Sequence, residues 1–341
     1  MKFAVLLPQT NQVASADAIG RAAVLAEDLG FHAISVHDHL QVNGWWVASG
    51  SRLPVPGGDD RTLFEAMTTL AFVAARTSRV RLLTSILLLP VREPVLLAKQ
   101  IATVDVLSGG RFICGVGVGP PLTEGRNETT KLAHHRTNAE KEYATFRLKG
   151  NRGALMDEYL QAMIAVWTQE SATFRGTHVD FEDIDVFPKP LQRPRPPIWV
   201  GGRSDFARDR CARSGETWNP SQCSPAQFAE GVARLELKFA AAGRSMGKDR
   251  ATNLFPAIAS SDAEAERIAA PAVGPMFASD REYRSRTIIG GPDTWVQVLK
   301  GWKAAGLNFC EIKPTYHTPD ELLAQLRLIA REVMPAFPEP R

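Results

Sequence analysis

The sequence predicts a single α/β domain folded as a (β/α)8 TIM barrel. Short apolar runs of strand length recur along the 341 residues, and segments with the three-to-four-residue spacing of amphipathic helices separate them. Near-continuous apolar strands that alternate with helices indicate a parallel sheet covered on both faces. The length also suits one barrel with insertions.

Eight apolar runs supply the strands of the expected barrel. They lie near Phe3–Leu7, Ala33–Val36, Val80–Ile86, Phe112–Gly117, Ile198–Val200, Thr217–Asn219, Asn253–Ala259 and Phe309–Lys313. A doubly wound open sheet is the alternative, and it would need a topological switch point. No GxGxxG turn follows the first run to mark one, so the barrel is favoured.

Three of the helical segments show their apolar face directly in the sequence. They cover Ile19–Leu29, Leu97–Val104 and Leu155–Val166, with Gly30 placed to end the first. A further helix begins near Asp205. Three segments, near residues 41–62, 120–153 and 260–290, are longer than barrel connections require and are expected to be insertions.

The composition excludes several classes of protein. The formal net charge is +3, and no basic block is interleaved with aromatic residues, so nucleic-acid binding is not expected. The four cysteines lack CxxC spacing, which excludes a zinc site or redox dithiol of that type and fits a reducing cytoplasm. No run reaches about 18 apolar residues, so we expect a cytoplasmic protein without a membrane span.

The insertion near residues 120–153 is positively charged. It contains seven Lys or Arg and four Glu residues, seven minus four, or +3, as much as the whole chain. Because it follows a strand end, it should lie over the C-terminal face of the barrel, where such folds place their active sites.

Two histidines follow the second strand. His37 and His39 should point to the same side, since side chains alternate along extended backbone. Their imidazoles are candidates for proton transfer, and the carboxylate of Asp38 is placed to orient a neighbouring ring. No third ligand is evident, so no metal is expected. Trp45 and Trp46 follow closely and are candidates to wall a pocket for a flat ring.

Other strand ends carry small or hydroxyl residues. Thr84 and Ser85 close the third strand and could serve a polar ligand or cap the next turn. Glycines at the end of the fourth strand permit close backbone approach and an anion cradle, or they serve packing alone. The fifth strand delivers Gly201, Gly202, Arg203 and Ser204 to a helix N-terminus, which predicts a phosphate site.

Together these pieces resemble the bacterial luciferase-like superfamily of flavin- and deazaflavin-dependent oxidoreductases. The most characteristic is Leu107-Ser-Gly-Gly-Arg-Phe followed by Gly-Val-Gly. The remaining pieces are Asp38-His39, Thr84-Ser85-Ile86, Arg152–Leu160, Phe187–Gly202, Trp218-Asn219-Pro220 and Gly306. They span nearly the whole chain.

The resemblance implies a ring cofactor at the C-terminal mouth and a non-prolyl cis peptide, here expected at Ser85–Ile86. It favours coenzyme F420 and hydride transfer with a small organic substrate. FMN is the alternative, which would imply an O2-using monooxygenase supplied by a flavin reductase. A non-catalytic flavin-binding subunit is the third reading.

The resemblance also implies roles for particular residues. His39 would handle a proton beside the ring. Cofactor-binding residues would be Asp38, His39, Thr84, Ser85, Ile86, Gly117, Val118, Gly119, Gly201, Gly202, Arg203 and Ser204, and the substrate pocket would include Trp45, Trp46, Trp218 and Asn219. Related barrels pair through helices near the second and third strands, so a homodimer using Leu63–Ala75 is expected.

The chain departs from the resemblance at one point. Related F420-dependent sugar-phosphate dehydrogenases place a glutamate proton donor just after the Gly-x-Gly turn, where this chain has Pro120 and Pro121. Either His39 handles the proton here or the substrate class differs.

Overall fold

The computed structural model describes the chain except for residues 41–61, 120–139, 149, 277–283 and 340–341. Eight parallel strands form a barrel in the order β10-β13-β1-β2-β3-β5-β8-β9. Their bounds are β1 Lys2–Leu6, β2 Ala33–Val36, β3 Arg81–Thr84, β5 Phe112–Gly117, β8 Ile198–Gly201, β9 Thr217–Asn219, β10 Ala251–Leu254 and β13 Phe309–Ile312. The predicted fold is confirmed.

The barrel closes between β9 and β10. Ser221, just beyond β9, forms a parallel bridge with Asn253 of β10. The hydroxyl of Thr252 donates to the Pro220 carbonyl over 2.8 Å. Since β10 also pairs with β13, this bridge brings the two ends of the sheet together into a nearly closed barrel.

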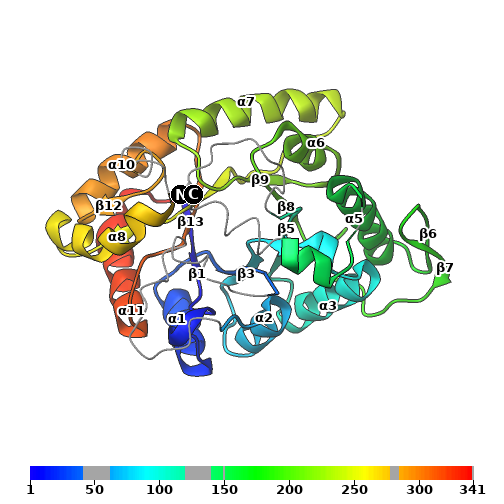
Figure 1. The fold of residues 1–341 in the computed structure, drawn as a ribbon, viewed down its shortest axis with the longest axis horizontal. Coiled ribbons are helices and arrows are strands. Elements are labelled where there is room, and N and C mark those ends of the chain that lie inside the picture. Colours follow the sequence, from blue (N-terminus) through cyan, green and yellow to red (C-terminus); the bar gives the residue numbers. More distant parts are fainter. Residues whose placement is uncertain (41–61, 120–139, 149, 277–283, 340–341) are drawn as a thin grey trace.

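Helices surround the barrel (Figure 1). They are α1 Ala16–Asp28, α2 Ala66–Ala74, α3 Pro94–Leu107, α5 Arg152–Thr168, α6 Asp205–Ser214, α7 Pro225–Ala241, α8 Asp262–Met276, α10 Pro292–Ala304 and α11 Pro319–Leu328. Several begin at a side-chain cap, as at Ser15, Asn151 and Ser204. The helices expected at residues 19–29, 97–104, 155–166 and from 205 are all present.

The apolar residues of α2 face this chain's own core. Met67, Leu70 and Val73 are buried within the chain. The barrel therefore explains the apolar character from which a dimer contact was expected, and the homodimer stays a prediction.

Two predicted strands are each divided. Beyond β3, the chain leaves the sheet at residues 85 and 86 and resumes as β4 (Leu87–Leu88), which pairs with β5. The run predicted at 253–259 becomes β10 and β11 (Ala257–Ile258), and β11 pairs with β12 (Ile289–Gly290). Within the predicted insertion 260–290, the structure describes α8 and β12.

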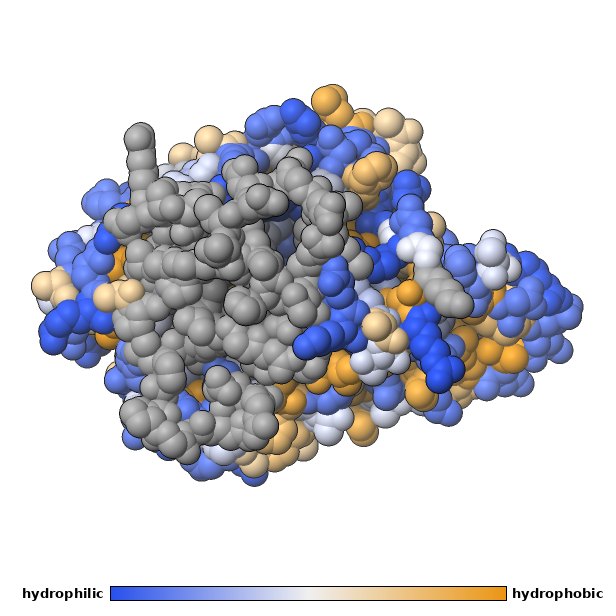
Figure 2. Space-filling model, in the orientation of Figure 1, coloured by the Kyte–Doolittle hydropathy of each residue, from blue (hydrophilic) through white to orange (hydrophobic). Residues whose placement is uncertain are grey.

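An antiparallel hairpin, β6 (Ala172–Arg175) and β7 (Asp180–Ile184), was not predicted. It projects beyond the barrel wall at the right of Figure 1. Its residues are mostly exposed, and that end of the molecule is mainly hydrophilic in Figure 2. The hairpin lacks the apolar run of the barrel strands because most of its residues are not buried.

Inside the barrel, side chains from neighbouring strands form layers, because alternate residues of each strand face inward. One layer is apolar and consists of Ala4, Ala33, Leu83, Ile113, Trp199, Ala251 and Phe309. The rings of Trp199 and Phe309 meet edge to face, 4.7 Å apart. Two residues further along their strands stand Ser35, Asn253 and Glu311, so the interior turns polar toward the C-terminal mouth.

Among the described residues, no helix is both long enough and apolar enough to cross a membrane.

Candidate active site

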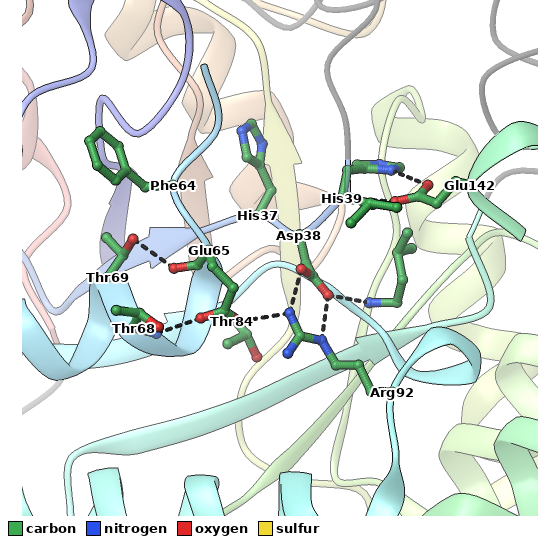
Figure 3. A network of polar contacts seen from close by, with 12 residues as sticks. His37, Asp38, His39, Phe64, Glu65, Thr68, Thr69, Thr84, Arg92 and Glu142 are labelled. Carbon is green, nitrogen blue, oxygen red and sulfur yellow. Dashed lines mark hydrogen bonds and ion pairs between the residues drawn. The ribbon is translucent and has the colours of Figure 1, made fainter. Parts of the chain in front are cut away.

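His39 and Glu142 form a pair at the barrel mouth. His39 Nδ1 lies 2.9 Å from Glu142 Oε2, and the other carboxylate oxygen accepts the backbone N–H of Leu40. Glu142 is 2% exposed, whereas the His39 side chain is 16% exposed. Since a carboxylate only accepts hydrogen bonds, Nδ1 carries the hydrogen that faces Glu142, and in the neutral imidazole Nε2 is then the ring nitrogen without a hydrogen. Figure 3 shows the two side chains facing each other.

Glu142 is a candidate functional residue that sequence reasoning missed. It is 103 positions from His39 and lies in a helical turn within the later part of the charged insertion. Nothing in the spacing of the sequence links it to His39. Glu142 places a carboxylate at the mouth, although prolines follow Gly119 at the position where the related dehydrogenases have their glutamate.

Asp38 does not orient a histidine ring, so that expectation is wrong. Its carboxylate receives two hydrogen bonds from the Arg92 guanidinium, at 2.6 and 2.9 Å, and one from Leu88 N at 3.0 Å. Arg92 continues to Glu65 at 2.8 Å. Although burial lowers the pKa of Arg92, the hydrogen bond and charge of Asp38 raise it above its usual value. Asp38 thus joins the loop after β2 to the start of α3 (Figure 3).

His37 lies in the barrel interior, 5% exposed. The Gln9 side chain holds its backbone through bonds of 2.8 Å from His37 N and 3.0 Å to His37 O. Burial lowers the pKa of His37 well below its ordinary value, and the nearby charges of Lys313 and His39 lower it further. His37 is therefore a neutral imidazole at pH 7.

The burial of His37 predicts that the protein loses stability in mild acid. Below the unfolded pKa of 6.5, the His37 imidazole is protonated in the unfolded chain but stays neutral in the folded chain. The free energy of unfolding should therefore fall by about 1.4 kcal/mol per pH unit from this group as the pH drops from 6.5 toward the folded pKa. Urea unfolding of wild type and His37→Asn at about pH 5 to about pH 8 measures this slope.

His37→Asn should lose that part of the slope. His32, whose pKa burial also lowers, keeps its own contribution in both proteins. Equal slopes in the two proteins would contradict the assignment of a buried neutral His37.

Thr84 and Ser85 have different roles. The Thr84 hydroxyl bonds both the N–H and the carbonyl of Gly115, at 2.8 and 2.9 Å, and so ties β3 to β5. The Ser85 hydroxyl donates to Glu311 Oε2 over 2.6 Å. The Ser85–Ile86 peptide is cis, as the resemblance implied.

The glycines at the ends of β5 and β8 make room for protein atoms. A Cβ on Gly117 would lie 2.0 Å from Ile86 Cδ1, and one on Gly201 would lie 2.5 Å from the same atom. The side chain of Ile86 thus fills the space between two strand ends while remaining partly exposed. These two glycines have a packing reason that does not involve a ligand.

Residues Val118 and Gly119 contact the later part of the charged insertion. The Val118 carbonyl accepts from Arg152 at 3.0 Å and from the Tyr143 hydroxyl at 3.4 Å. Gly119 has φ +78°, and a Cβ there would lie 2.0 Å from the Tyr143 oxygen. Burial raises the pKa of Tyr143 to about 12. Tyr143 is adjacent to Glu142, so this contact helps to fix the carboxylate.

The expected phosphate turn has the predicted form. Gly202 has φ +107° and Ser204 caps α6, and the turn from residue 202 to 205 is exposed. The Arg203 guanidinium donates to the Gln222 carbonyl over 2.7 Å. Exposed backbone N–H groups at a helix N-terminus beside a guanidinium suit a phosphate.

Trp218 is buried between β9 and α7, and its place in the substrate pocket stays a prediction. It stacks on Phe228 of α7 with centroids 6.1 Å apart, and its Nε1–H donates to the Gly202 carbonyl over 2.6 Å. Asn219, the next residue of β9, faces the opposite way. Its amide lies 3.3 Å from Glu311 Oε2, while its buried Oδ1 has no hydrogen-bond partner among the described residues.

Glu311 and Lys313 of the last strand are further polar residues that sequence reasoning missed. Glu311 is 0% exposed, and Lys313 is 7% exposed. Burial lowers the pKa of the Lys313 ammonium, an effect that Glu311 opposes. The signal was available, because two charges at alternate positions of an apolar strand point to the same side, and inside a parallel barrel that side is buried.

Two residues expected in the substrate pocket, Trp45 and Trp46, lie outside the described residues.

Within the described part of the chain, no three His, Cys, Asp or Glu side chains gather as a metal site. The four cysteines are free and buried.

Comparison with known proteins identifies the family of the chain. The family model described as luciferase-like monooxygenase matches residues 1–306. The chain belongs to this family, and the relatives below that have a named activity are oxidoreductases or monooxygenases.

Similar proteins use two kinds of cofactor. An uncharacterized Mycobacterium tuberculosis protein is 34% identical over 65% of this chain and 74% of its own. The FMNH2-dependent dimethylsulfone monooxygenase of Pseudomonas putida is 30% identical over 53% of this chain and 46% of its own. The F420-dependent glucose-6-phosphate dehydrogenase of Microbacterium testaceum is 30% identical over 57% and 49%. The latter two matches thus span about half of each relative.

A solved structure supports the fold. The monooxygenase RslO1 from Streptomyces bottropensis superposes with a TM-score of 0.74 over 99% of this chain and 100% of its own. At 22% identity this likeness concerns the fold alone.

Proposed function

We propose that this protein is an F420-dependent oxidoreductase that transfers a hydride to or from a small organic substrate. The observation that carries the proposal is the His39–Glu142 pair. A carbonyl that gains a hydride must also gain a proton, and an alcohol that loses one must lose a proton. A partly exposed imidazole oriented by a buried carboxylate is suited to that transfer.

The residues present fit a flavin-type cofactor. The exposed turn from Gly202 to Ser204 offers a phosphate site, and Ile86 presents a partly exposed apolar side chain at the mouth. Asn219 Oδ1, which has no hydrogen-bond partner in the described part of the chain, is an acceptor that a ligand N–H could use. When bound, the deazaflavin supplies the hydride donor or acceptor, while this chain's residues bind it, exclude water and move the proton at His39 Nε2.

An FMNH2-dependent monooxygenase is the second candidate. The family description and the Pseudomonas putida relative favour it. It would use the same phosphate turn, with O2 as co-substrate and a separate flavin reductase as partner. A cytoplasmic location belongs to both proposals.

Cofactor titration tests the two candidates. We expect the purified protein to bind F420 at micromolar concentration, followed by intrinsic Trp fluorescence, and FMN or reduced FMN more weakly. Arg203→Met should weaken cofactor binding by about tenfold or more, because a charge-assisted hydrogen bond to phosphate is lost. The matched control is Arg213→Met, which changes an exposed arginine in the last turn of α6, the helix that follows the phosphate turn.

Each outcome has a clear meaning. Binding of reduced FMN without F420 would replace the first candidate by the second. Stable flavin binding without turnover on ketones, alcohols or imines would support a non-catalytic subunit. An equal loss of affinity in both arginine variants would remove the phosphate turn from the proposal.

A further inference from the structure

Glu311 joins distant parts of the barrel wall. Its Oε1 accepts the Ser35 hydroxyl of β2 over 2.7 Å, and its Oε2 accepts the Ser85 hydroxyl over 2.6 Å. The carboxylate is fully buried. Hydrogen bonds to a buried charged group are stronger than neutral ones, so these contacts restrain both serines.

The hydroxyl and the carbonyl of Ser85 both attach to the end of β13, while its N–H donates to the Val36 carbonyl over 2.7 Å. While the hydroxyl reaches Glu311, the carbonyl accepts from Lys313 Nζ over 3.1 Å. Lys313 Nζ also lies 3.8 Å from Glu311 Oε1, so the two charges form a buried pair. Ser85 is held through its side chain and its backbone at once, which leaves it little freedom to shift.

The side chain of Ile86, the residue after Ser85, is partly exposed. Ile86 fills the gap between Gly117 and Gly201, yet its side chain remains partly exposed at the mouth. A surface that supports a flat ring must be held within a fraction of an ångström, since small displacements weaken binding. Packing against two glycines restrains the Ile86 side chain, and the contacts of Ser85 restrain the backbone from which it extends.

We propose that Glu311 and Lys313 are positioning residues, which fix Ile86 through Ser85 as the surface on which the cofactor ring packs. The inference rests on the proposed function in that it takes a ring cofactor to bind at this mouth. A purely structural pair would affect the stability of the barrel alone. A positioning pair also affects the geometry of Ile86 and the affinity for the ring.

Two serines on one carboxylate provide a matched test. Ser85→Ala and Ser35→Ala each remove one hydroxyl from Glu311, with nearly equal hydrogen-bond lengths. Their effects on urea unfolding should be similar. Ser85→Ala should weaken the dissociation constant of the bound cofactor by about tenfold, while Ser35→Ala should leave it within about twofold.

A second measurement does not depend on any cofactor. In protein labelled with ¹³C at isoleucine Cδ1, the Ile86 methyl signal is assigned with Ile86→Val. Ser85→Ala should shift or broaden this signal, and Ser35→Ala should not. Glu311→Gln should shift the Ile86 signal in the same direction as Ser85→Ala. The variant that carries both substitutions should show a smaller shift than the sum of the two single shifts, because both act through one contact.

The outcomes separate the two proposals. If wild type binds neither F420 nor FMN, the proposed function fails, and the methyl signal still decides whether Glu311 positions Ile86. An unmoved Ile86 signal in Ser85→Ala overturns the inference. So does an equal loss of cofactor affinity in both serine variants, since it would mean that Glu311 only stabilises the barrel.

Discussion

Replacing His39 by alanine should lower turnover by about 10²–10⁴-fold, the usual contribution of a positioned general acid or base. The free energy of unfolding should fall by about 1–3 kcal/mol, because the buried Glu142 carboxylate loses its imidazole donor. Steady-state kinetics of the wild type and the variant, with urea unfolding of both, measure the two effects. The loss should appear in kcat, because proton transfer belongs to the chemical step.

The partner residue tests the same idea without removing the imidazole. In Glu142→Gln, the side-chain NH₂ can donate to His39 only when Nδ1 carries no hydrogen. The neutral ring then carries its hydrogen on Nε2, which is the other tautomer. Turnover should fall in the same direction as in His39→Ala. His178→Ala changes an exposed histidine of the projecting hairpin and should have no effect. Full activity of Glu142→Gln would mean that the pair does not transfer the proton.

Gly115→Ala should destabilise the protein by at least about 3 kcal/mol. The added Cβ would lie 1.8 Å from the Thr84 carbonyl oxygen, which is backbone of the neighbouring strand and cannot rotate away. The Thr84 hydroxyl already bonds both polar groups of Gly115, so the two strands cannot separate without breaking that pair. The midpoint of urea unfolding measures the effect.

Gly301→Ala is the matched control. Gly301 lies inside α10 and is exposed, and an added Cβ meets nothing within 4 Å. The substitution should stabilise the protein by about 0.5–1 kcal/mol, because alanine loses less entropy in a helix. A loss under about 1 kcal/mol in Gly115→Ala would contradict the close packing of β3 on β5.

Much of the barrel could be predicted from local pattern. The strands at Ala33–Val36 and Phe112–Gly117 have the predicted bounds, because parallel strands buried on both faces require continuous apolar runs. The β6–β7 hairpin could not be found in this way. Its stability comes from a few contacts, such as Phe174 with Phe181, and most of its residues face solvent.

The candidate site was only partly predictable. The turn at Gly202–Ser204 could be placed because a strand, glycines and a helix start are adjacent in sequence. The packing of Trp218 on α7 could not be predicted, because its residue type suits both a pocket and a core. Asp38 was misassigned because its partner, Arg92, is 54 positions away.

The sequence by itself determined the fold class, the family and the order of the strand ends that form the mouth. Those properties depend on the periodicity of apolar residues and on short motifs, which act over a few positions. The tertiary structure decided which polar groups meet: Glu142 with His39, Arg92 with Asp38, and Glu311 with Ser85. Closing the barrel brings residues more than 50 positions apart within hydrogen-bonding distance, and burial then requires each charge to find a partner.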